Sequence, residues 1–533
     1  MPLSRASRAA VRAVVVLVLV AFPLLLGPSA FAHATVVASD PAPGSLLTTA
    51  PTEVSVTFDE SVTVVPDAVR VYGPDGSRVD RGAVLRPGDA GDEVGVAIDA
   101  HGEGTYLVSW RVVSADSHPV TGAFTFSVGK RSGAPTVAAV GSDSGLAKLL
   151  GLARAVGYAG SALLLGGALL LGLAGPAPAG REQGRRLLLG LGVGALVGGA
   201  VVGLLVQGAY DAGLGWSAIA RPSLVGDLLA TTFGHGLLLR IAAAVAFGLV
   251  LAVARGTVRN LLLVLCGLGV VTSFAMTGHG VAGPLPFVST TVHVAVASIW
   301  LGGLAVLAVL VLPKPADARV LVTRFSLVAT VCVAVLVVTG TYQAWRQVGA
   351  WGALTATTYG RELLVKLGLV LLVLVAAAFS HRWVDGRGTS PVARLRRSVE
   401  MELVLGMAVI GVTAVIATTM PATAAYHPSA SARLVAGPDV VEVLAVPAGD
   451  RTMTLDLLLL DGQGRPTNPP EVDATVALPG QDLGPLPVAL HRVGRGHLAA
   501  SVGVPVVGTW TLSVTVRTTA IDEYVVTTRL PIR

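Results

Sequence analysis

The chain has 533 residues, of which 53% are hydrophobic and only 13% are charged. Soluble domains carry about 25% charged residues, so this composition excludes a wholly soluble protein and places much of the chain in a lipid bilayer. The formal net charge is +6, but the arginines gather in short loops between apolar runs, which indicates membrane topology and not nucleic-acid binding. The two cysteines lie in apolar runs and exclude a disulfide framework or a C-x-x-C metal site.

Residues 1–32 have the pattern of a cleaved secretory signal. A basic head precedes the apolar run 13–26, and an A-x-A sequence ends at Ala32. Cleavage after Ala32 would make His33 the first residue, with a free α-amine and an imidazole that can chelate one metal ion together. The alternative is that His33 simply begins a loose terminus.

Residues 33–130 are predicted to form a β-sandwich, because short alternating runs such as 54–58 and 123–128 are separated by turn signals. Near the end of this segment, Asp116 and His118 are two residues apart. In an extended chain they project to the same side, so both can reach one ion. Alone, they would be interpreted as a turn residue and a surface histidine. Together with the processed amino terminus they form a candidate metal site.

This segment resembles CopC, the copper-binding β-sandwich of bacterial periplasms. The resemblance lies in the start His33-Ala34, the Ser-Asp-Pro-Ala-Pro-Gly run at 39–44, the Val-Thr-Phe-Asp-Glu strand at 56–60 and the Ser-Ala-Asp-Ser-His-Pro motif at 114–119. It implies a copper(II) site formed by His33, Asp116 and His118, with Glu60 where some members place a further carboxylate. Imidazole nitrogens and an anionic oxygen suit copper(II), the strongest binder of the divalent series. His101 is interpreted as an exposed turn residue and not as a ligand.

A linker at 131–145, rich in Gly, Ser and Pro, precedes eight apolar runs that are each long enough to cross a bilayer. The spans are expected at about 146–174, 187–209, 236–254, 260–278, 288–312, 320–345, 362–380 and 401–420. Arginine and lysine concentrate in every second loop, which the positive-inside rule assigns to the cytoplasm. The even number of spans then leaves both termini outside, in agreement with the secretory signal.

Three residues near the outer face are candidate copper ligands in the membrane. Met276 and His279 end the fourth predicted span, and His293 lies early in the fifth. Ionisable groups at membrane depth are functional candidates by default, and a thioether suits copper(I). The alternatives are a helix cap for His279, an interhelical hydrogen bond for His293 and ordinary core contacts for Met276.

Four cationic side chains also fall in the outer halves of spans: Arg154, Arg240, Arg361 and Lys366. A path for copper cations should not be lined by unpaired cations. We therefore expect these side chains to pair with Asp211, Asp227 or Glu362, or to extend to the membrane interface.

The region 146–420 resembles CopD, the multi-span copper-resistance and uptake protein that often accompanies CopC. The resemblance is carried by separate motifs at 276–280, 292–304, 324–326, 340–345, 359–366 and 397–403. A CopC domain fused ahead of CopD is similar to the fused copper importers of the YcnJ type.

Residues 427–533 return to alternating strands and predict a second outer β-sandwich. The Gly-Thr-Trp-Thr-Leu run at 508–512 gives it a slight resemblance to YtkA-like accessory domains. His427, His491 and His497 have no metal-ligand spacing and are interpreted as surface residues.

The sequence thus predicts a plasma-membrane protein with two β-sandwich domains around an eight-helix bundle. It would capture copper(II) outside the cell and pass it to the bundle for uptake, with copper and the bilayer as partners and without enzymatic activity. The absence of P-loop and D-K-T-G motifs disfavours an ATP-driven pump. Two alternatives remain. The first is copper delivery for oxidase assembly without net import, with a copper chaperone or an oxidase as partner. The second is a histidine-brace copper oxidase.

Overall fold

A computed structural model of the chain describes most of its length. The described residues are 34, 36–86, 91–114, 119–133, 135, 144–174, 182–219, 221–312, 318–384, 392–426, 429–449, 452–479, 483–504, 508–519 and 521–532. The predicted secretory signal and the candidate ligands His33, Asp116 and His118 lie outside these residues, as does the side chain of His279.

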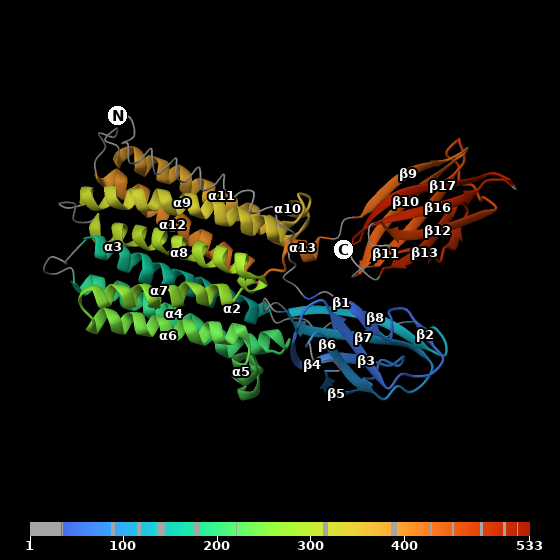
Figure 1. Cartoon of the computed structure of the whole chain (residues 1–533), viewed down its shortest axis with the longest axis horizontal. Helices are drawn as coiled ribbons and strands as arrows, with labels where there is room; N and C mark the ends of the chain where they lie inside the picture. Colours follow the sequence, from blue (N-terminus) through green and yellow to red (C-terminus); the bar gives the residue numbers. More distant parts are fainter. Residues whose placement is uncertain are drawn as a thin grey trace. The chain divides into compact units, whose positions relative to one another are not determined.

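The first β region contains two four-stranded sheets, which confirms the predicted sandwich (Figure 1). One sheet has the order β1 (Val36–Asp40), β3 (Glu53–Phe58), β6 (Glu93–Ile98) and β5 (Asp80–Leu85). The other has the order β2 (Leu46–Leu47), β8 (Pro119–Val128), β7 (Gly104–Val113) and β4 (Thr63–Tyr72). Alternate residues of β3 are buried, and in the core the rings of Tyr106 and Phe126 stack with their centroids 5.2 Å apart.

Eight helices of the described chain are long and apolar enough to cross a membrane, which confirms the predicted number of spans. In chain order they are α2 (Ser144–Ser161) continuing through a π-helical turn (Ala162–Gly166) into α3 (Gly167–Ala174), α4 (Glu182–Asp211), α6 (Thr232–Val253), α7 (Gly256–Met276), α8 (Pro284–Val306) extended by a π-helical turn (Leu307–Val311), α9 (Ala318–Val348), α11 (Thr358–Val384) and α12 (Val392–Ile416). Three short helices, α5 (Pro222–Leu229), α10 (Ala353–Ala356) and α13 (Ala422–Ala425), lie in segments predicted as loops.

Every span begins earlier in the chain than predicted, and the fifth and the last spans illustrate why. The fifth span begins at Pro284 and not at 288, because proline is tolerated in the first turn of a helix, where its missing N–H has no intrahelical partner. The last span was expected at 401–420, but α12 covers Val392–Ile416. The prediction places the basic first turns of this helix in a loop because they are charged, although Arg and Lys are good helix formers.

Helix α8 packs closely against the π-helical turn of the first span. A Cβ atom added at Gly302 would lie 1.8 Å from the carbonyl oxygen of Ala162, so only glycine permits this approach. The hydroxyl groups of Ser161 and Ser298 form a buried hydrogen bond of 2.7 Å across the same contact. Small residues and a polar link are the usual means by which membrane helices associate.

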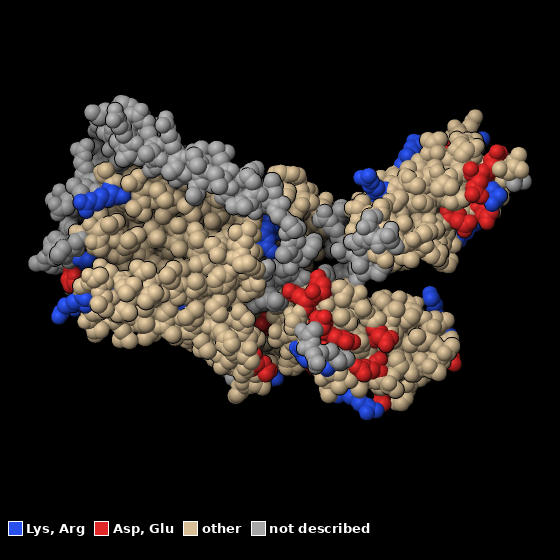
Figure 2. All heavy atoms as spheres, viewed as in Figure 1, with Lys and Arg blue, Asp and Glu red and all other residues tan. Residues whose placement is uncertain are grey.

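The outer surface of the bundle is apolar. Leu261, Leu371 and Val404 are each at least 60% exposed, which is favourable only against lipid tails. Figure 2 shows the described surface of the bundle as largely uncharged, with Lys and Arg gathered toward its ends.

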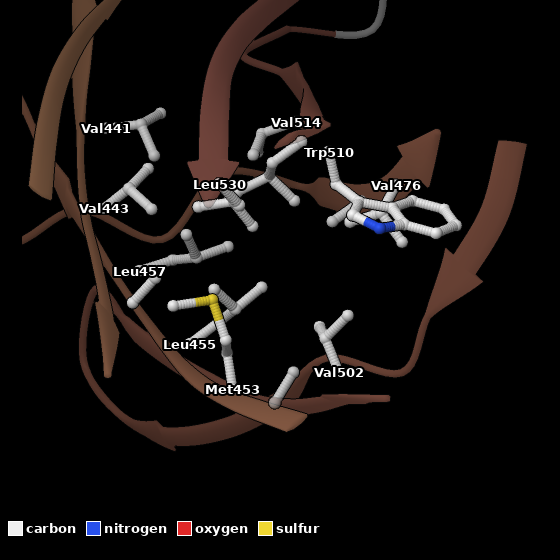
Figure 3. Close-up of a cluster of buried hydrophobic side chains, with 14 of the residues drawn as sticks. Val441, Val443, Met453, Leu455, Leu457, Val476, Val502, Trp510, Val514 and Leu530 are labelled. Carbon is white, nitrogen blue, oxygen red and sulfur yellow. The ribbon is translucent and has the colours of Figure 1, made fainter. Parts of the chain in front are cut away.

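The C-terminal region is a second pair of sheets, which confirms the second predicted sandwich. One sheet has the order β14 (His491–Gly494), β15 (His497–Gly503), β11 (Thr452–Leu460), β10 (Asp439–Gly449) and β9 (Ala430–Ala436). The other has the order β13 (Leu483–Val488), β12 (Glu471–Leu478), β16 (Gly508–Arg517) and β17 (Glu523–Ile532). Side chains from both sheets, among them Met453, Val476 and Trp510, are directed into one core (Figure 3).

Candidate functional site

The first candidate site belongs to the loop between β7 and β8. These strands pair antiparallel, with Val113 opposite Pro119. Asp116 and His118 fall between the two strands in the sequence and lie outside the described residues. Glu60 follows β3 and is half-buried, whereas His101 is exposed, as predicted. The proposed ligand set therefore stays a prediction.

In the membrane, Met276 and His293 lie in different surroundings. Met276 is the last residue of α7, and its Cβ lies 2.9 Å from the position that a Cβ at Gly236 of α6 would occupy. This contact fits the interpretation of Met276 as a core residue. His279 begins a short 3₁₀ turn, His279–Ala282, just beyond α7.

His293 lies on α8, and its Nδ1 is 2.8 Å from the hydroxyl oxygen of Thr339 on α9. The Thr339 hydroxyl oxygen also lies 2.8 Å from the carbonyl oxygen of Val335. In the tautomer in which Nδ1 carries the proton, Nδ1–H donates to Thr339 and the Thr339 hydroxyl donates to Val335. The imidazole then keeps an unprotonated Nε2, which is the form that binds a metal. The predicted interhelical hydrogen bond is thus present, and it is compatible with a ligand role.

A cavity of about 180 Å³ lies at the end of the bundle where α2 begins and α9 ends, and His293 is part of its wall. All eight spans contribute to the lining, including Tyr158 of α2, Tyr342 of α9 and Tyr359 of α11. Four cationic side chains also line it: Arg154, Arg240, Arg346 and Lys366. We call this space the cationic cavity.

Arg154 and Arg240 do not form the ion pairs that the sequence suggested. Arg154 donates to the carbonyl oxygen of Ala417 at 2.8 Å. Arg240 donates to Ser273 and to Thr277, the latter at 2.7 Å, and its guanidinium lies 3.7 Å from the ring centroid of Phe274. In the described chain, neither arginine is within ion-pair distance of a carboxylate.

The carboxylates expected as partners are engaged elsewhere. Asp211 accepts a hydrogen bond of 2.9 Å from the Gln207 side chain, and Glu362 accepts one of 2.8 Å from Thr419. Asp227 is exposed on α5. The expected ion pairing is therefore wrong. Ion pairing depends on how each helix is rotated about its axis, and the order of charges along the chain does not encode that rotation.

A second cavity of about 230 Å³ lies at the opposite end of the bundle, between α8, α9, α11 and α12. Its lining is mostly apolar, and its charged member is Glu402, which is 3% exposed. The Glu402 carboxylate accepts a hydrogen bond of 2.5 Å from Ser380. We call this space the acidic cavity. A buried carboxylate in an apolar run is the signal that could have revealed it from the sequence.

Among the described residues, no three His, Cys, Asp or Glu side chains form a group that could hold a metal. In the C-terminal region, His491 is exposed as predicted, but His497 is half-buried and its Nε2 lies 2.8 Å from a carboxylate oxygen of Asp456.

The comparison with known families agrees with this architecture. Residues 36–129 match the CopC domain, residues 145–285 match the N-terminal domain described as copper resistance protein D-like, and residues 319–416 match copper resistance protein D. The fold and these matches define a multi-pass membrane protein of the copper resistance and transport class. The chain carries CopC and CopD domains in one polypeptide.

The chain is also similar to individual proteins. Copper transport protein CutJ of Bacillus subtilis (strain 168) is 28% identical over 424 residues, which are 76% of this chain and 77% of CutJ. Copper resistance protein C of Escherichia coli is 35% identical over 107 residues, 19% of this chain and 84% of that protein. The crystal structure of PcoC, a methionine-rich copper resistance protein from Escherichia coli, is 30% identical; it covers 18% of this chain and 99% of its own, with a TM-score of 0.16.

Proposed function

We propose that the protein captures copper(II) outside the cell and transfers it to the helical bundle for uptake. The observation that carries this proposal is the order of the matched regions, with a CopC domain directly ahead of both CopD regions in one chain. A relative named as a copper transport protein aligns over 76% of the chain.

In the capture step, cleavage after Ala32 exposes His33 as a chelating amino terminus. Asp116 and His118 complete the copper(II) site from the β7–β8 connection, and Glu60 supplies a further carboxylate near the metal. This donor set of nitrogen and anionic oxygen suits copper(II) in a square arrangement.

In the transfer step, both termini lie outside the cell, and the cationic cavity then opens toward the outer half of the membrane. His293 offers its unprotonated Nε2 in the wall of that cavity, and His279 lies at the nearby end of α7. Copper(I) is the form that Met276 would bind, but its contact with α6 favours a packing role.

The capture step is tested on the full chain purified from the membrane. Mass spectrometry should find His33 as the first residue, and competition titration should show weaker copper(II) binding in His33→Ala and His118→Ala. His101→Ala is the matched control, because His101 is an exposed histidine of the same domain. A first residue other than His33, or unchanged affinity in both variants, would remove this site.

A further inference from the structure

The cationic cavity carries more positive charge than its surroundings balance. Arg154, Arg240 and Lys366 all line it, and the described lining contains no Asp or Glu. Asp211 and Glu362 are the carboxylates on neighbouring turns, and each accepts its hydrogen bond from an uncharged side chain. Even if both remained ionised, Arg154, Arg240 and Lys366 would leave an excess of one positive charge at the cavity.

Several N–H donors in the cavity have no acceptor in the protein. The Lys366 ammonium group makes no hydrogen bond or ion pair with any described residue. Arg154 uses Nη1 for Ala417, and Arg240 uses Nε and Nη2 for Ser273 and Thr277. The remaining guanidinium N–H groups have no acceptor among the described side chains and carbonyls.

This arrangement is costly unless an anion completes it. Charges in a low-dielectric interior repel one another strongly, and each unpaired buried donor loses the hydrogen bond that it made in water. Two guanidinium groups and an ammonium group that line one cavity are the kinds of donor that bind carboxylate or phosphate oxygens. Three tyrosines of the lining, Tyr158, Tyr342 and Tyr359, add hydroxyl groups around it.

We propose that the cationic cavity is a binding site for an oxyanion, a carboxylate or phosphate group held by Arg154, Arg240 and Lys366. The bound anion neutralises the cavity and permits a metal cation to approach Nε2 of His293. Without it, the cavity repels a bare copper ion. This inference goes beyond copper uptake, because the anion site exists whether or not copper passes through the bundle.

The test uses the full chain in nanodiscs of zwitterionic phosphatidylcholine, without copper. Citrate and inorganic phosphate are titrated calorimetrically, against sodium chloride at matched ionic strength. The wild-type chain should bind citrate or phosphate, and Lys366→Gln and Arg154→Gln should each weaken binding by about tenfold or more, because each removes a charge-assisted hydrogen bond.

Arg361→Gln is the matched control. Arg361 lies on the same helix as Lys366, is exposed, and donates to Thr358 at 3.4 Å. It should leave anion binding unchanged. Lys366→Met keeps the aliphatic stem and removes a repulsive charge. Its unfolding temperature without an anion should therefore equal or exceed that of the wild type. This result would show that removal of the charge at position 366 does not misfold the protein.

A second set of nanodiscs contains anionic phosphatidylglycerol and identifies the source of the anion. If the lipid phosphate occupies the site, phosphatidylglycerol will raise the unfolding temperature of the wild type but not of Lys366→Gln, and it will suppress citrate binding. If citrate binds equally in both lipids, the ligand is a dissolved anion. Absence of citrate, phosphate and phosphatidylglycerol effects, or effects that persist in Lys366→Gln, would overturn the proposal.

Discussion

The two cavities of the bundle lie at opposite ends of the same helices and carry opposite charge. The cationic cavity collects side chains from all eight spans and has four Arg or Lys residues in its wall. The acidic cavity lies between four spans and has Glu402 as its charged member among the described residues. Helices α8, α9, α11 and α12 contribute to both, so the two spaces share a frame but differ in their electrostatics.

The difference shows that the bundle is not one uniform path for positive ions. A copper cation is favoured near Glu402 and disfavoured near Arg154 and Lys366, because only the first site offers a negative charge. If copper enters through the cationic cavity, an anion must accompany it there.

The largest effect is expected when the charge of the acidic cavity is reversed. Glu402→Lys places an unpaired ammonium group in an apolar space and removes the hydrogen bond from Ser380, so it should destabilise the bundle by about 3 kcal/mol or more. Thermal unfolding of the purified chain in detergent measures this. Glu400→Lys is the control, since Glu400 is exposed on the same helix, and an equal loss in both variants would contradict the account.

Neutralising the same carboxylate tests its role in transport. Glu402→Gln retains an oxygen that accepts from Ser380, so stability should change by about 1 kcal/mol at most. Copper accumulation by cells should nevertheless fall, by about tenfold, because the buried charge of this cavity is gone. Normal accumulation would show that copper does not pass Glu402.

An effect of comparable size on copper accumulation is expected from the partner of His293. Thr339→Val removes the oxygen that fixes the imidazole tautomer, so copper accumulation should fall by about tenfold through the disturbed orientation of Nε2. Thr272→Val is the control, because the Thr272 hydroxyl bonds only to carbonyl groups of its own helix. Equal accumulation in the two variants would show that His293 is not a ligand.

The smallest effect is expected at Met276. Met276→Leu conserves volume in a side chain that contacts α6, so unfolding should change by less than about 1.5 kcal/mol and copper accumulation should not change. A selective loss of copper accumulation in this variant would instead identify the thioether as a copper(I) ligand.

The sequence predicted the architecture well, since hydropathy and strand alternation are local signals. Eight spans and both sandwiches followed from them. The site was less predictable, because it depends on contacts between distant helices. Arg240 meets Ser273 and Thr277 of the next span and no carboxylate, and Thr339 reaches His293 across 46 positions. The rotation of each helix about its axis decides such contacts. Apolar periodicity would predict that rotation, but the periodicity is weak in spans that are hydrophobic on most sides.

The central claim, copper uptake that begins at His33, Asp116 and His118, is tested most directly by whole-cell copper content at limiting external copper. A deletion strain should contain less copper than its parent, the wild-type chain should restore the content, and His118→Ala should not. Unchanged copper content together with a copper-deficient terminal oxidase would contradict import and identify the protein as a delivery factor.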